Sequence, residues 1–68
     1  MNEYIMTFGY GQLYDGRNMD SHYYRIHADS NLEARVQAFE LFDNQWCAMY
    51  DSEEEAGVQE FNLIELKI

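Results

Sequence analysis

The sequence predicts a single α+β domain spanning residues 1–68, in which one face of a small antiparallel sheet packs against one amphipathic helix. The chain is short enough for one domain only, because 68 residues bury a limited share of their surface. Hydrophobic residues make up 47% of it and aromatic residues 16%, which is too apolar for a disordered acidic segment even at a net charge of −9. The hydrophobic spacing places the elements in the order strand, strand, helix, strand, strand.

The first two strands are predicted over residues 4–10 and 22–28, where side chains alternate between two faces. Between them, residues 12–21 contain Asp15 and Gly16, which favour a turn because Asp and Gly tolerate positive φ. We therefore expect a long hairpin loop that joins two antiparallel strands.

A helix is predicted to begin after Ser30, because Ser30 and Glu33 have the spacing of a capping box. Its helical character ends near Asp43. When residues are placed at 100° intervals, five apolar side chains fall on a stripe that we expect to face the sheet: Leu32, Val36, Ala38, Phe39 and Phe42.

The C-terminal third predicts a third strand over residues 46–50, followed by a second capping box that begins at Ser52. Gly57 is a suitable residue to end this short helical turn. Residues 58–68 are compatible with an edge strand or with a short helix followed by an extended tail, and we favour the strand.

One helix covers only one face of a sheet, so the other face is expected to stay uncovered. Six tyrosines, four phenylalanines and one tryptophan are more than one face needs, and several should lie on the open side. A chain this small gains little net stability from its own core. Dimerisation through the open face would therefore stabilise it.

Few side chains in the sequence have the chemistry of a catalytic or metal site. Cys47, His22 and His27 are the only cysteine and histidines, whereas a structural zinc needs four such ligands at recognisable spacing. The two histidines are five residues apart in a strand and so point to opposite faces, and Cys47 has the ordinary pattern of a small buried thiol. We predict no catalytic residue, no metal and no cofactor.

The cysteine usage and the N-terminal sequence bear on the compartment. Secreted domains of this size usually carry several disulfides, and Cys47 has no partner. The start at Met1 has no basic and apolar signal segment, and no apolar run is long enough to span a bilayer. We expect a cytoplasmic protein that does not enter membranes.

The distribution of acidic residues is the strongest functional signal. Residues 40–66 contain no lysine or arginine but eight acids: Glu40, Asp43, Asp51, Glu53, Glu54, Glu55, Glu60 and Glu65. Such a charge repels phosphate backbones and anionic lipid, so direct binding to nucleic acid or membranes is not expected. Two interpretations stay open, a solvated face that keeps the protein soluble and a surface that imitates a nucleic-acid backbone.

If the second interpretation holds, the partner is a basic nucleic-acid-binding protein or complex. Tyrosines beside the acids would anchor the contact, because Tyr is common at interface hot spots. The predicted partner-binding residues are Asp51, Glu53, Glu54, Glu55, Glu60, Tyr10, Tyr14 and Tyr50.

Several stretches resemble a group of small phage and prophage proteins of unassigned function: residues 4–12, residues 24–30, Ala34-Arg35 with Phe39 and Phe42, and residues 45–50. In size and acidity the chain also resembles phage anti-defence inhibitors, including anti-CRISPR proteins. That resemblance implies a non-enzymatic protein that blocks a basic nucleic-acid channel of the host. It assigns no functional residue.

Three hypotheses follow from the sequence. The first is a phage-encoded inhibitor of a host nucleic-acid-binding defence complex. The alternative is a structural or scaffolding module that associates with itself through the uncovered sheet face, for example as a homodimer. An enzymatic function would require Cys47, the only candidate nucleophile of its kind.

Overall fold

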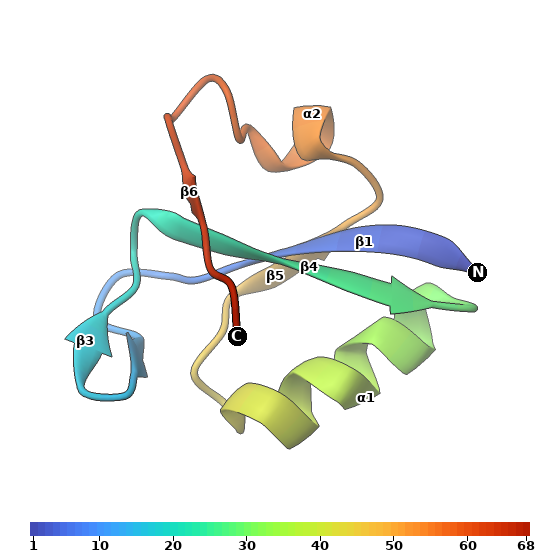
Figure 1. Cartoon of the computed structure of the whole chain (residues 1–68), viewed down its shortest axis with the longest axis horizontal. Helices are drawn as coiled ribbons and strands as arrows, with labels where there is room; N and C mark the ends of the chain where they lie inside the picture. The colour runs from blue at the N-terminus through green and yellow to red at the C-terminus, as the bar shows by residue number, and fades with distance from the viewer.

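The computed structural model describes residues 1–68 as a twisted sheet with a helix on each face (Figure 1). The α+β class predicted from the sequence is confirmed. In chain order the elements are β1 (Asn2–Thr7), β2 (Leu13–Tyr14), β3 (Arg17–Asn18), β4 (His22–Ala28), α1 (Asn31–Phe42), β5 (Ala48–Tyr50), α2 (Glu53–Ala56) and β6 (Ile64–Glu65).

The main sheet has the strand order β5-β1-β4-β6. Strands β4 and β5 both run antiparallel to β1, but β6 runs parallel to β4. The prediction of a purely antiparallel sheet is therefore wrong at this edge. Parallel strands need a crossover of about a dozen residues or more, and residues 51–63 supply one that carries α2 over the sheet.

The predicted strands are found close to their expected positions. The boundaries of β4 match the prediction. Strand β1 begins two residues before the predicted strand and ends three residues before it, and β5 begins two residues late. Of the edge strand expected over residues 58–68, only Ile64–Glu65 form a strand. The loop between β1 and β4 contains the small hairpin β2–β3. Its turn residues Asp15 and Gly16 have φ values of 53° and 77°, as two-residue hairpin turns require.

Helix α1 begins as predicted, because the Ser30 hydroxyl accepts a hydrogen bond from the Glu33 amide at 3.1 Å. The prediction that Ala38 and Phe42 face the sheet is confirmed, but the rest of the buried face differs from the predicted stripe. The buried residues are Ala34, Ala38 and Phe42. The strands and the approach to β5 fill this core with large side chains, including Met6 and Trp46, so the helix contributes mainly alanines, which allow it to lie close to the sheet.

The larger apolar residues of the predicted stripe lie outside the core. Leu32 is 73% exposed, Val36 50% and Phe39 54%. The prediction that these three face the sheet is wrong, because helical spacing identifies an apolar stripe without identifying which small residues fit beneath it.

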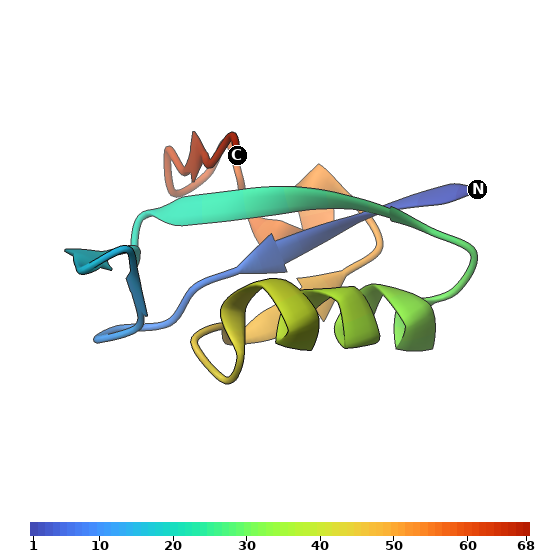
Figure 2. The same ribbon diagram turned by 60° about the horizontal axis from the view of Figure 1, so that its bottom comes forward.

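The second face of the sheet is covered, contrary to the prediction. A second small core of Ile5, Tyr23, Ala56 and Val58 lies there, with Tyr50 and Leu63 packed against it. Helix α2 and the residues that follow it supply this cover (Figure 2). The uncovered sheet face through which the chain was expected to dimerise is therefore absent.

Helix α2 has the predicted caps. The Ser52 hydroxyl accepts from the Glu55 amide at 3.2 Å, and Gly57 ends the helix with φ of 75°. None of the helices has the length or the apolar character needed to cross a membrane.

We expect Gly57→Ala to lower the free energy of unfolding by about 1–2 kcal/mol. A side chain at this φ is strained, and its Cβ would lie 2.6 Å from Cδ2 of Phe61. Gly11→Ala is the matched control, because Gly11 also has positive φ but has open space around it. Urea denaturation should show a larger loss of unfolding free energy for Gly57→Ala than for Gly11→Ala. Equal losses would show that the Phe61 contact contributes nothing.

Candidate functional site

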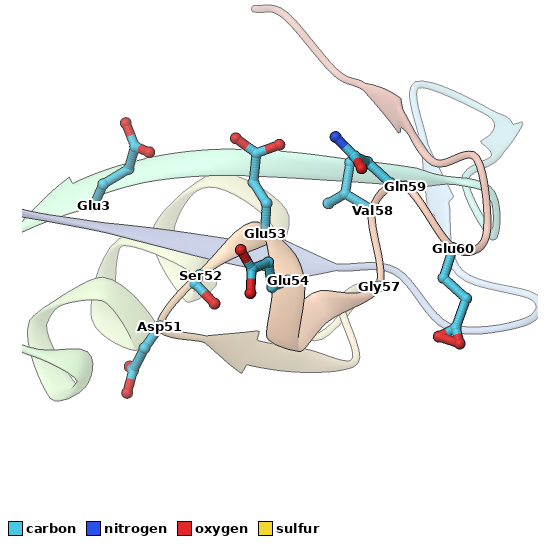
Figure 3. Close-up of a pocket in the computed structure, with 9 residues that line it drawn as sticks. All are labelled: Glu3, Asp51, Ser52, Glu53, Glu54, Gly57, Val58, Gln59 and Glu60. Carbon is cyan, nitrogen blue, oxygen red and sulfur yellow. The ribbon is translucent and has the colours of Figure 1, made fainter.

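An acidic surface surrounds α2. We define it by the five carboxylate residues that line a shallow hollow of about 580 Å³: Glu3, Asp51, Glu53, Glu54 and Glu60. Ser52, Gly57, Val58 and Gln59 complete the lining, and Val58 is its only hydrophobic member (Figure 3). Four of the five predicted acidic contacts are thus brought together, and a fifth acid, Glu3, joins them.

The local sequence explains how these carboxylates are placed. Asp51 follows the end of β5, and the Ser52 cap then starts α2. The first turn of α2 carries three glutamates, which suits the positive end of the helix dipole. Gly57 then reverses the chain and places Gln59 and Glu60 on the far rim of the hollow (Figure 3).

Arg25 lies at the centre of a polar network on this face of the sheet. Its Nη1 donates to Glu3 at 2.6 Å, its Nη2 to Glu53 at 3.0 Å, and its Nε to Glu65 at 3.4 Å. Its side chain is 22% exposed. One guanidinium therefore joins four elements: β1, β4, α2 and β6.

The network neutralises part of the acidic surface and leaves the rest free. The hydrogen bond to Glu53 is the largest cause that raises the pKa of Arg25 above its ordinary value, so the guanidinium stays charged. Glu3 and Glu53 share this cation. The side chains of Asp51, Glu54 and Glu60 form no ion pair.

Tyr23 lies beneath this network. Its hydroxyl donates to Oε1 of Glu65 at 3.4 Å and accepts from Nη2 of Arg25 at 3.5 Å. Burial raises the pKa of Tyr23, and the charges of Glu65 and Glu53 raise it further. The neutral phenol is therefore favoured in the folded state.

We expect the protein to lose stability as the pH rises above about 10, the ordinary tyrosine value. Because the folded state holds the Tyr23 proton more tightly than the unfolded state, the contribution is complete below that pH and disappears as the pH rises through the higher folded pKa. Thermal unfolding between pH 8 and 12 measures it. The Tyr23→Phe variant should decline less steeply with pH, and an unchanged slope would contradict this assignment.

The remaining predicted contacts lie outside the hollow. Glu55 is exposed on α2 but does not line it, and Tyr50 is partly buried against the second core. Tyr10 is 93% exposed beyond the C-terminal end of β1, whereas Glu3 lies near the other end of that strand. Tyr14 packs on the Phe42 ring with centroids 5.4 Å apart. These three tyrosines therefore do not line the hollow beside the carboxylates.

The residues with potential for catalysis or metal binding are dispersed. No group of three or more His, Cys, Asp or Glu side chains is arranged to hold a metal ion. Cys47 is exposed, contrary to the prediction of a buried thiol, because its neighbour Trp46 points into the core and Cys47 belongs to neither buried cluster. His22 and His27 lie at opposite ends of β4.

Glu3 and Arg25 belong to this site but were not among the residues predicted for it. Both lie on the same face of adjacent strands, where Glu3 is opposite His27 and Arg25 opposite Ile5. The available signal was the position of Arg25 between Tyr23 and His27 on one side of an alternating strand. A positive charge at that place needs an acidic partner from a covering element.

Comparisons of this chain with protein-family models, with curated proteins and with solved structures each find no match.

Proposed function

We propose that this chain is a non-enzymatic binding protein whose acidic surface occupies the basic nucleic-acid site of another protein. The observation that carries the proposal is the set of three carboxylates, Asp51, Glu54 and Glu60, which lie on one hollow without a cation. Unpaired carboxylates attract Lys and Arg side chains and accelerate encounter with a basic surface.

The arrangement of the acids supports imitation of a nucleic-acid backbone. In Figure 3 the carboxylates of Asp51, Glu54 and Glu60 lie apart on the surface and do not converge on one point. A row of separated negative charges is what a phosphate backbone presents to its binding proteins. A convergent group would instead suit a single metal ion.

A rigid base supports the acidic surface. The Arg25 network attaches α2 to the sheet, and Ala56 and Val58 bury their side chains beneath it. Preorganised groups lose less conformational entropy on binding, so a fixed set of carboxylates gives more affinity than a flexible acidic tail.

The resemblance to phage anti-defence inhibitors extends the proposal to a biological setting. In this proposal the chain is encoded by a phage, acts in the cytosol of the host and blocks a nucleic-acid-binding defence complex in the manner of anti-CRISPR proteins. The small size and the net charge of −9 support it.

A capture experiment tests the proposal. The chain is immobilised through a tag on its C-terminus, and a nuclease-treated bacterial lysate is passed over it at low salt. Bound proteins are then eluted with short duplex DNA or RNA, or with dextran as a neutral polymer. We expect nucleic acid to release a basic protein that dextran leaves bound. If the bound proteins are released equally by both polymers, imitation of nucleic acid is rejected.

A further inference from the structure

The outer side of α1 carries an apolar stripe of three residues, Leu32, Val36 and Phe39, all at least half exposed. Their spacing of four and then three residues places them on one side of the helix. Phe39 also packs edge to face on Trp46, with ring centroids 5.1 Å apart, which holds the C-terminal end of the stripe in place. The stripe therefore has the spacing of a helix-pairing seam and a fixed position.

We propose that this stripe pairs with the same stripe of a second copy of the chain, with the two α1 helices parallel. In coiled-coil terms Leu32 and Phe39 occupy d positions and Val36 the a position between them. The contact spans about two helical turns, so the dimer is weak and depends on concentration.

The charges beside the stripe specify a second copy and its direction. Arg35 precedes Val36 at a g position, and Glu40 follows Phe39 at an e position. In a parallel pair, each g residue faces the e residue five positions further along the partner helix, so Arg35 meets Glu40 of the other copy twice. In an antiparallel pair, Arg35 would meet Arg35 and Glu40 would meet Glu40.

Both charged side chains are available for this contact. Arg35 and Glu40 are exposed and form no ion pair within the chain. The Nε of Arg35 donates to Asn31 one turn earlier at 2.8 Å, which leaves its two Nη groups free. The stripe ends at Asp43, where φ of 55° turns the chain away from the helix axis.

The dimer leaves the acidic surface free. Helix α1 lies on one side of the sheet and α2 lies on the other (Figure 2). Two copies joined through α1 therefore present two acidic surfaces that face away from the seam. Self-association and binding to a basic partner can be tested separately.

Sedimentation equilibrium of the whole chain over a range of concentrations tests the apolar part. We expect Leu32→Ser with Val36→Ser to weaken the association constant by about tenfold or more. Leu41→Ser is the matched control, because Leu41 is 47% exposed on another side of α1. A wild-type chain that stays monomeric at all concentrations, or equal effects of the two variants, would overturn the proposal.

A charge exchange tests the direction. Arg35→Glu and Glu40→Arg alone should each weaken association by about fivefold, and the double variant should restore it. Glu40→Arg is the more informative of the two single changes, because it lowers the net negative charge. If general repulsion between the two negatively charged copies dominated, this variant would associate more strongly. Additive losses in the double variant would reject the parallel pairing.

Discussion

Replacing Arg25 with methionine is expected to lower the free energy of unfolding by about 2–3 kcal/mol. The variant keeps much of the aliphatic volume but leaves Glu3, Glu53 and Glu65 close together without their shared cation. The loss lies between that of a surface ion pair and that of a fully buried one, because the Arg25 side chain is 22% exposed. Such a loss is a large fraction of the stability of a small domain.

Two further variants separate the charge of Arg25 from its geometry. Arg25→Lys keeps the charge, but one ammonium nitrogen cannot occupy the places of the three separate nitrogens that reach Glu3, Glu53 and Glu65. We expect this variant to lose about half as much stability. Arg17→Met is the control, because Arg17 lies exposed on β3 without an ion pair. Urea denaturation measures all three, and a loss for Arg25→Met no larger than that for Arg17→Met would contradict the role of the network.

Neutralising the unpaired part of the acidic surface is expected to weaken binding to the captured basic partner by about tenfold or more. The variant combines Asp51→Asn, Glu54→Gln and Glu60→Gln. Glu53 is left intact because Arg25 holds it and its loss would disturb the fold. Titration calorimetry with the purified partner measures the affinity, and circular dichroism should be unchanged.

The control removes the same number of charges elsewhere. Asp15→Asn, Asp29→Asn and Glu33→Gln change exposed acids that form no ion pair and lie outside the hollow. This control variant has the same net charge as the variant with the neutralised acidic surface. If net charge alone attracts the partner, both variants bind equally weakly; if the acidic surface is the contact, the control binds almost as well as the native chain.

The fold could be predicted to the extent that local sequence determines it. Both serine caps, the Asp15-Gly16 turn and strand β4 follow from short-range rules and are confirmed. The parallel placement of β6 could not be predicted in this way. Its two residues are fixed by the crossover that α2 makes over the second face, not by their own propensity.

The buried face of α1 was predicted only at Ala38 and Phe42, for a related reason. Helical spacing favours the largest apolar residues, but Ala34 and Ala38 occupy the space against the sheet because Phe8 and Trp46 already fill the core. Leu32 and Val36 are consequently exposed. Which face packs is a property of the volumes on both layers and is not encoded in the helix alone.

The acidic surface could be predicted in part. Four of its carboxylates are close in sequence, so their clustering needed no tertiary information. Glu3 comes from the opposite end of the chain, and Arg25 comes from the middle, so the division into paired and unpaired acids depends on the sheet register. Tyrosines were expected beside the acids, but Tyr10 and Tyr14 lie in the segment between β1 and β4 and do not line the hollow.

The salt dependence of binding to the purified partner shows whether the acidic surface makes the contact. If the acidic surface replaces a phosphate backbone, the logarithm of the association constant should fall linearly with the logarithm of the salt concentration, and duplex DNA should compete for the same site. For the variant with the neutralised acidic surface, this plot should have a shallower slope than for the control variant. Binding that is independent of salt, or that tolerates saturating DNA, would contradict the account.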